Sequence, residues 1–373
     1  MIYLDYNATA PTKPAVILAV TEILRSHGNP SSVHGAGRAA RKQVEQARLS
    51  LADLIKVKPA QVVFTSGGTE SNNMVLNQPT YRAVAVSMAE HDSVLAARAD
   101  HVPLPVLPNG LIDLAAYDAT LQKLPALSLV SVMLVNNETG VIQPVAELAA
   151  IAHRYGHHFH TDAIQAAGRL DVDFTKLGVD YLTLSAHKIG GPQGVGAVIV
   201  RENAQVVPFI KGGGQEMNRR AGTENVAGIC GFGVAARLAA DDLVRGQQLG
   251  AWRDDLQQRL LAVTDNKAIV IGAEAPRVAN TLNIALPGVS SETQVMALDL
   301  AGIAASAGSA CSSGKVKVSY VVKAMGYADD IAGSTLRLSL GWSSQSSDVD
   351  RCVDAYKTLY GRIRARSSSH AAA

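Results

Sequence analysis

The chain has 373 residues, of which 47% are hydrophobic and 18% charged, a balance typical of a folded globular protein and unlike that of disordered or fibrous chains. A total of 34 Lys and Arg against 32 Asp and Glu leaves a formal net charge of +2, too small an excess for a protein whose main partner is nucleic acid. The sequence contains neither a secretory leader nor an apolar run of membrane length, so we expect a cytoplasmic protein without a membrane partner.

Short β-branched runs alternate with amphipathic stretches over the first two thirds of the chain. The predicted strands are 62–65, 83–87, 127–136, 158–162, 181–185 and 197–201. The predicted helices between them are 37–55, 70–78, 93–100, 114–123 and 145–155. This alternation predicts the α/β class, with a mostly parallel sheet covered by helices.

The pattern changes in the last third of the chain. A helix of small residues is predicted near 225–238 and a polar helix at 247–261. Shorter strands follow at 268–271 and 281–285, and a last helix begins at 347. We interpret this change as a second, smaller domain that begins near Gly246.

The segment 66–70, with the sequence SGGTE, lies between a predicted strand and a predicted helix. Glycines let the backbone approach an anion, the start of a helix presents unpaired N–H groups, and Ser66 and Thr69 add hydroxyls. These features suit a phosphate group, although a plain strand-to-helix turn accounts for the five residues equally well.

Asp162 stands at the C-terminal end of a predicted strand, the edge at which ligands bind in open α/β sheets. Its carboxylate could hold a metal, accept from a ribose or pair with a protonated ring nitrogen. Four histidines, at positions 153, 157, 158 and 160, raise the metal alternative. Because His157 and His158 are adjacent and point to opposite sides of a strand, we favour surface or core histidines and expect no resident metal.

Lys188 follows another predicted strand in the segment SAHK at 185–188. A lysine that is desolvated there can lose its proton and form a Schiff base with an aldehyde. Cys311 lies in a run of small and polar residues, a predicted loop that exposes its thiol, whereas Cys230 and Cys352 have apolar neighbours and are predicted to be core residues. A phosphate cradle, a carboxylate and an amine are what pyridoxal 5′-phosphate requires, and they predict an enzyme that uses it.

A series of motifs in this chain resembles those of the cysteine desulfurases of the NifS/IscS type, which are class-V aminotransferase-like enzymes. The motifs are YLDYNAT at 3–9, GNPSS at 28–32, FTSGGTESNN at 64–73, EH at 90–91, VNNETG at 135–140, HTDAIQ at 160–165, SAHKIGGPQG at 185–194, GGGQEMNRRAGTEN at 212–225, GSACSS at 308–313 and LRLSLG at 336–341. The resemblance implies fold type I of the pyridoxal phosphate enzymes. It also implies a large domain of residues 15–245 and a small α/β domain, made of residues 1–14 and 246–373, that carries the catalytic cysteine.

The resemblance further implies a role for each matching residue. Lys188 would bind the cofactor and take the α-proton of the substrate, His91 would stack on the ring and move protons, and Cys311 would take sulfur from L-cysteine as a persulfide, with L-alanine as product. The ring nitrogen would pair with Asp162 and the ring hydroxyl with Gln165. The phosphate would be held by Gly68, Thr69, Ser185 and His187, and by Thr223 from the second subunit of a homodimer. The substrate carboxylate would bind Arg337, with Asn137 nearby.

The implied partners are L-cysteine and a sulfur-acceptor or scaffold protein, such as one that assembles iron–sulfur clusters, and Cys311 itself stays open as a transient ligand of such a cluster. Two alternatives remain. The chain could be another lyase or aminotransferase of fold type I, for example a selenocysteine lyase, which would not need Cys311. It could also be a catalytically silent scaffold that has kept the fold.

Overall fold

The structure, a computed structural model, describes residues 1–308 and 318–371, with side chains up to residue 365. Seven strands form the main sheet in the order β2-β8-β7-β6-β5-β3-β4. Their bounds are β2 Val62–Thr65, β3 Val84–Ser87, β4 Val102–Leu104, β5 Leu129–Ser131, β6 His158–Asp162, β7 Tyr181–Ser185 and β8 Gly196–Val200. Strand β8 runs antiparallel to both of its neighbours, and every other pair in this sheet is parallel. The prediction of an α/β fold with a mostly parallel sheet is confirmed.

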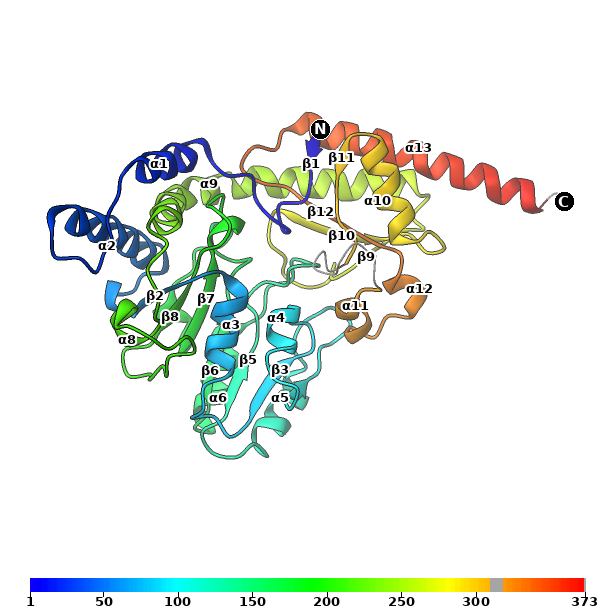
Figure 1. The fold of residues 1–373 in the computed structure, drawn as a ribbon. Coiled ribbons are helices and arrows are strands. Elements are labelled where there is room, and N and C mark those ends of the chain that lie inside the picture. The colour runs from blue at the N-terminus through cyan, green and yellow to red at the C-terminus, as the bar shows by residue number, and fades with distance from the viewer. Residues whose placement is uncertain (309–317, 372–373) are drawn as a thin grey trace.

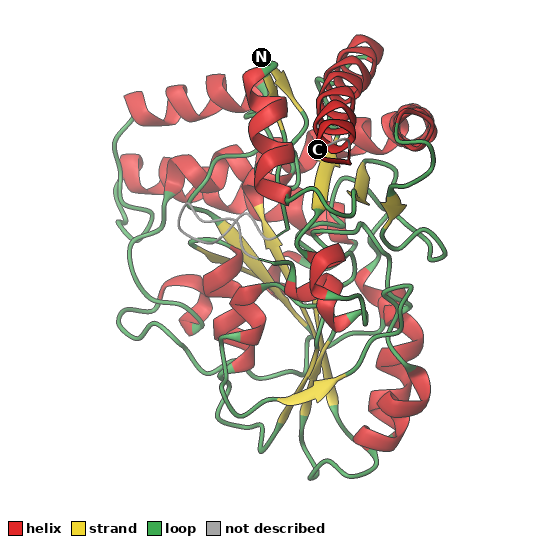
Figure 2. Ribbon diagram, turned by 90° about the vertical axis from the view of Figure 1, so that its right-hand side faces the viewer, coloured by secondary structure: helices red, strands yellow, loops and turns green. Residues whose placement is uncertain are grey.

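Helices cover both faces of the main sheet, so its strands are buried on each side (Figure 2). One face packs against α2 (Gly35–Ile55), α5 (Leu114–Leu121), α6 (Val145–Arg154), α7 (Phe174–Leu177) and the first half of α9 (Val226–Val263). The other face packs against α3 (Gly68–Leu76) and α4 (Asp92–Leu95). Side chains alternate between the two faces along each strand, as Val62 and Val63 do in β2.

A second, antiparallel sheet has the order β12-β10-β9, with bounds Thr335–Ser339, Thr281–Ala285 and Ile269–Val270. Helices α10 (Ser291–Leu300) and α13 (Ser346–Ala371) lie beside it (Figure 1). The N-terminal strand β1 (Ile2–Tyr3) pairs with β11 (Ile303–Ala304), so Ile2 and Leu4 join the apolar core of this part of the chain. The division into domains at residue 245 stays a prediction.

Several elements differ from the predictions. The helices predicted at 225–238 and 247–261 are one helix, α9, which runs along both parts of the molecule (Figure 1). Gly246 lies inside it, because one glycine costs a helix only about 1 kcal/mol relative to alanine. The strand predicted at 127–136 ends at Ser131. The chain then turns at Asn136, whose Oδ1 accepts from the N–H groups of Glu138 and Thr139. Helix α4 is shorter than the predicted 93–100.

The sequence analysis also missed several elements. Helix α1 (Pro14–Arg25) begins with a proline, a residue favoured at this position. The strands β1, β4, β11 and β12 and the helices α7 and α10 were also not predicted. The remaining missed elements are η1 (Pro59–Gln61), η2 (Ala186–Lys188), α8 (Gln215–Asn218), α11 (Tyr320–Ala324) and α12 (Asp329–Ala332). In the part of the chain that the structure describes, no helix is both long and apolar enough to cross a membrane.

Candidate functional site

A cavity of about 260 Å³ opens where the parallel strands β6 and β7 end. Its lining residues are Asn7, Ala8, Gly68, Thr69, His91, Ser93, Met133, Asn137, Asp162, Ile164, Gln165, Ser185, His187, Lys188 and Arg337. The structure thus brings together all the predicted cofactor and substrate residues apart from Thr223. Cys311 lies outside the described residues.

The start of α3 forms one wall of this cavity. Gly67 precedes the helix with φ 152°, and it caps the helix without a side chain, so the first N–H groups of α3 are left to a ligand. A Cβ atom on Gly68 would lie 2.3 Å from Ile164 Cδ1, so a larger residue at this position requires the Ile164 side chain to move. The arrangement suits an anion at the N–H groups of Gly68 and Thr69.

Asp162 is the last residue of β6 and is buried at the floor of the cavity. Its Oδ2 accepts from Asn72 Nδ2 at 2.8 Å, and its Oδ1 accepts from the N–H of Ile164 at 2.9 Å. Burial raises the pKa of the Asp162 carboxyl, while these two hydrogen bonds and the nearby His91 and Lys188 oppose that rise. A cationic ring nitrogen beside this carboxylate would complete its neutralisation.

The N-terminal segment forms a second wall, opposite η2. Lys188 Nζ donates to the backbone oxygens of Asn7 at 2.8 Å and Ala8 at 2.6 Å. Gln165 Nε2 donates to the same Asn7 oxygen at 2.9 Å, and Gln165 Oε1 accepts from Arg169. Because Arg169 can only donate, the Gln165 oxygen must face Arg169. This fixes the orientation of the amide and therefore the direction of its second N–H.

His187 and His91 differ in what surrounds them. His187 Nδ1 lies 3.1 Å from Thr9 Oγ1, and burial together with the charge of Lys188 lowers the pKa of His187 to about 4. His91 precedes α4, where its Nδ1 accepts from the N–H of Ser93 at 3.1 Å and lies 2.8 Å from Ser93 Oγ. Both imidazoles therefore have one ring nitrogen committed to the protein.

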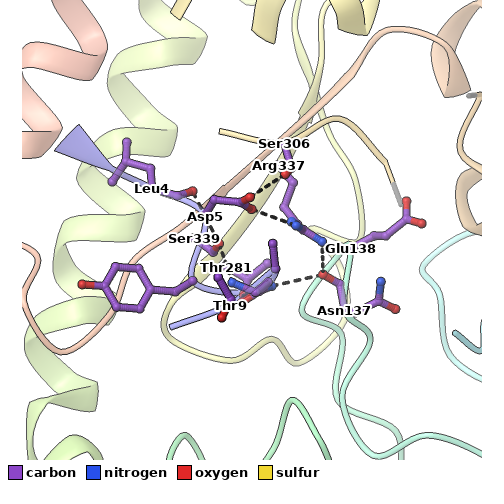
Figure 3. A network of polar contacts seen from close by, with 12 residues as sticks. Leu4, Asp5, Thr9, Asn137, Glu138, Thr281, Ser306, Arg337 and Ser339 are labelled. Atoms are coloured by element: carbon purple, nitrogen blue, oxygen red, sulfur yellow. Dashed lines mark hydrogen bonds and ion pairs between the residues drawn. The ribbon is translucent and has the colours of Figure 1, made fainter. Parts of the chain in front are cut away.

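Arg337 and Asn137 meet on the third side of the cavity (Figure 3). Arg337 is 1% exposed, and its guanidinium pairs with Asp5 Oδ1 at 2.8 Å and donates to the backbone oxygen of Asn137 at 3.0 Å. Arg337 Nε and Asn137 Oδ1 are buried without a hydrogen-bond partner among the residues that the structure describes. A substrate with one donor and one carboxylate would satisfy both atoms.

The chain on either side of residues 309–317 is anchored beside Arg337. Ser306 Oγ donates to Asp5 Oδ2 at 2.7 Å, and the Ser306 and Arg337 backbones bond to each other (Figure 3). Ser319 Oγ donates to Glu138 Oε2 at 2.6 Å. Burial raises the pKa of Glu138, and the charge of Arg337 opposes that rise.

Thr223 does not line the cavity and is exposed. The four histidines of the metal alternative have separate partners: Asp180 for His153, the Leu121 oxygen for His157, Tyr81 for His158 and Ser131 for His160. Within residues 1–308 and 318–365, no three His, Cys, Asp or Glu side chains are grouped to hold a metal ion. Cys352 is fully buried, which confirms the prediction, but Cys230 is only half-buried.

Sequence reasoning missed several residues that hold this site. Asp5, Asn72 and Ser93 were given no role, although the first two fall within recognised motifs. Periodicity offered one signal for Asn72, because Val75 and Leu76 share the buried side of α3 with it. An amide on that side requires a polar partner.

Comparisons with known proteins agree along most of the chain. The family model for class-V aminotransferases matches residues 2–352. An IscS-like cysteine desulfurase of Mycobacterium tuberculosis is 39% identical over 98% of this chain and 97% of its own length, and a cysteine desulfurase of Cereibacter sphaeroides has the same identity and coverage. The solved structure of a NifS-like protein from Rickettsia africae superposes with a TM-score of 0.91 at 32% identity, covering 97% of this chain and 99% of that chain.

Proposed function

Because the chain belongs to the class-V aminotransferase family, and within it to the cysteine desulfurases, we propose that it takes sulfur from free L-cysteine and releases L-alanine. The observation that carries the proposal is the single cavity in which Lys188, Asp162 and Arg337 meet. An amine, a buried carboxylate and a guanidinium around one cavity match an amino acid bound next to a cationic ring.

The residues of the cavity fit pyridoxal phosphate, on which enzymes of this family depend. Gly68, Thr69, Ser185 and His187 would hold the phosphate at the open start of α3. Lys188 would bind the aldehyde, and Gln165 and Asp162 would contact the ring hydroxyl and the ring nitrogen. When bound, this cofactor supplies an aldehyde for the substrate amine and a ring that accepts electrons from its α-carbon.

The protein's own residues orient the substrate and move its protons. Arg337 binds the carboxylate through Nε, the guanidinium nitrogen that neither Asp5 nor the Asn137 backbone oxygen occupies, and Asn137 Oδ1 accepts from the substrate. Lys188 Nζ takes the α-proton, and the Asn7 and Ala8 carbonyls accept from the ammonium that forms.

We assign the sulfur transfer to Cys311 by the match of its motif. Its thiolate would attack the substrate sulfur, so that an S–S bond forms as the C–S bond breaks. The substrate carbon keeps the electron pair and takes a proton, which gives L-alanine and a persulfide on the protein. The anchors at Ser306 and Ser319, both beside residues that neighbour Arg337, support this assignment.

The proposal extends to partners. The persulfide would pass to a sulfur-acceptor protein, such as one that assembles iron–sulfur clusters, in the cytoplasm. A homodimer is proposed because Thr223 is exposed and outside its own cavity, which suits a contact with the cofactor phosphate of a second subunit. Exposed apolar side chains on and after α1, Leu18 at 69%, Leu24 at 72% and Val33 at 88%, support an interface. Sedimentation of the purified protein would test it.

The test of function incubates the purified protein with L-cysteine, measures alanine and maps sulfur adducts on the Cys311 peptide by mass spectrometry. We expect alanine and the adduct from the wild type, and no persulfide from Cys311→Ala, which still binds the cofactor. Cys230→Ala is the matched control and keeps both products. Alanine without an adduct would favour a lyase that releases sulfur directly. Neither product, in protein without cofactor absorbance, would favour the silent scaffold.

A further inference from the structure

A row of polar side chains crosses the sheet face that packs against α3. Most of this face is apolar, but next to the cavity it carries Ser131 of β5, His160 and Asp162 of β6, and Thr183 of β7. The strand register places Ser131 beside His160 and Asp162 beside Thr183. All four are buried, and so is Asn72, the α3 residue that bonds to this row. Buried polar groups on an apolar face persist only where they satisfy one another.

The row is linked by successive hydrogen bonds that end at the Asp162 carboxylate. Ser131 Oγ lies 2.9 Å from His160 Nδ1, and His160 Nε2 lies 3.4 Å from Thr183 Oγ1. Thr183 Oγ1 donates to Asn72 Oδ1 at 2.7 Å, and Asn72 Nδ2 donates to Asp162 Oδ2 at 2.8 Å.

The donor and acceptor of every hydrogen bond in this row follow from the group at its end, the Asp162 carboxylate. The Asp162 carboxylate can only accept, so the nitrogen of the Asn72 amide faces it and the amide oxygen faces Thr183. Thr183 therefore donates to Asn72 and accepts from His160, whose proton is on Nε2. Burial lowers the pKa of His160 to about 3, so the imidazole is neutral and its Nδ1 accepts from Ser131. Bonds aligned in one direction polarise one another and strengthen the last donor.

The second N–H of Asn72 starts a branch toward His91. It donates to Ser93 Oγ at 2.9 Å. With that lone pair occupied, the Ser93 hydroxyl donates to His91 Nδ1, which also accepts from the Ser93 N–H. The ring proton of neutral His91 is therefore on Nε2, and this nitrogen acts as a donor.

We infer that Asn72 is a positioning residue with two tasks: one amide hydrogen holds the Asp162 carboxylate, and the other, through Ser93, keeps His91 in its Nε2-protonated form. The inference rests on the proposed function for the identity of the group that Asp162 and His91 face. Its consequence is a division of labour. Asp162 is held ionised to keep a ring nitrogen protonated, and His91 donates toward the cavity while Lys188 acts as the base.

The experiment compares two buried threonines in the enzyme loaded with pyridoxal phosphate that carries ¹⁵N in its ring. Thr183→Val removes the donor to Asn72 with little change of shape. Thr161→Val is the matched control, because Thr161 is equally buried but donates to the Val132 oxygen on the other face of β6. We expect Thr183→Val to shift the ring-nitrogen NMR signal toward unprotonated pyridine and to lower kcat about tenfold, with KM within about twofold. Thr161→Val should do neither, at a similar loss of thermal stability.

The branch is tested by ¹⁵N NMR of histidine in the protein, with and without cofactor, with His91 assigned from its loss in His91→Gln. The wild type should show His91 protonated at Nε2. Ser93→Ala should bring the ¹⁵N chemical shifts of the two His91 ring nitrogens closer together, and Ser93→Thr should keep them as far apart as in the wild type. A Thr183→Val enzyme that matches Thr161→Val in both signal and kcat, or a wild-type His91 protonated at Nδ1, would overturn the inference. Wild-type protein that shows the expected signals but makes no alanine would overturn the proposed function alone.

Discussion

Glu216→Gln should destabilise the protein far more than the loss of one surface charge. Glu216 is paired with Arg48, and the two side chains are 2% and 6% exposed. Its carboxylate accepts three hydrogen bonds at 2.8 Å, two from the Arg48 guanidinium and one from the N–H of Phe64. The pair also holds a strained turn, since Glu216, Met217 and Asn218 have φ values of 47°, 56° and 62°.

The magnitude follows from counting donors. Glutamine has one acceptor oxygen in place of two, so at least one of the three N–H donors loses its partner and faces another donor. Burial alone would lower the pKa of Arg48, but Glu216 raises it above its usual value, and the substitution removes this compensation. Breaking one partner of a buried pair costs about 3 to 5 kcal/mol, and we expect about 4 kcal/mol here.

Urea unfolding of the wild type, of Glu216→Gln and of a control variant measures this cost. The matched control is Asp350→Asn, which breaks the exposed pair between Asp350 and Arg259, 62% and 36% exposed, and should cost less than about 1 kcal/mol. Replacing Arg48 and Glu216 together by methionine should restore part of the loss, because no uncompensated charge remains buried. A Glu216→Gln protein that is no less stable than Asp350→Asn would refute the reasoning.

Three further predictions follow from single contacts. Asp5→Asn removes the counter-ion of Arg337 and should cost about 3 kcal/mol in urea unfolding while lowering KM for L-cysteine, because Asp5 no longer neutralises the positive charge that attracts the substrate carboxylate; an unchanged KM would contradict this. The pKa of His160 is lowered to about 3 in the folded state, whereas the unfolded state binds a proton at this residue below about pH 6.5. The free energy of unfolding should therefore decrease as the pH is lowered, by up to about 1.4 kcal/mol per pH unit. Between about pH 6 and 4.5, His160→Gln should remove this slope. Gly68→Ala should weaken cofactor retention on dialysis, and adding Ile164→Val, which removes the clashing Cδ1, should restore retention. A double variant that retains the cofactor no better than Gly68→Ala would show that the clash lies elsewhere.

Elements defined by local pattern were predicted well. Strands β2, β6, β7 and β10 match their predicted ranges residue for residue. β2, β7 and β10 are short runs of mostly apolar, aromatic or β-branched residues. Elements that depend on distant partners were missed. Strand β12 is completed by β10, and β1 pairs with β11 from the far end of the chain. β1 and β11 have two residues each, too few to show a periodicity of their own.

The same division separates the two kinds of residue in the candidate site. Lys188 and Asp162 were identified because an amine or a carboxylate at the end of a strand suggests chemistry by its type and place alone. Asp5 and Asn72 act through another side chain, and the identity of that side chain depends on how the chain folds. What the sequence does contain is a conflict, a polar residue at a position where the helix period demands an apolar one. That conflict predicts a buried polar partner, but only the fold shows which residue it is. For Asn72, the partners are the carboxylate of Asp162 and the hydroxyls of Ser93 and Thr183.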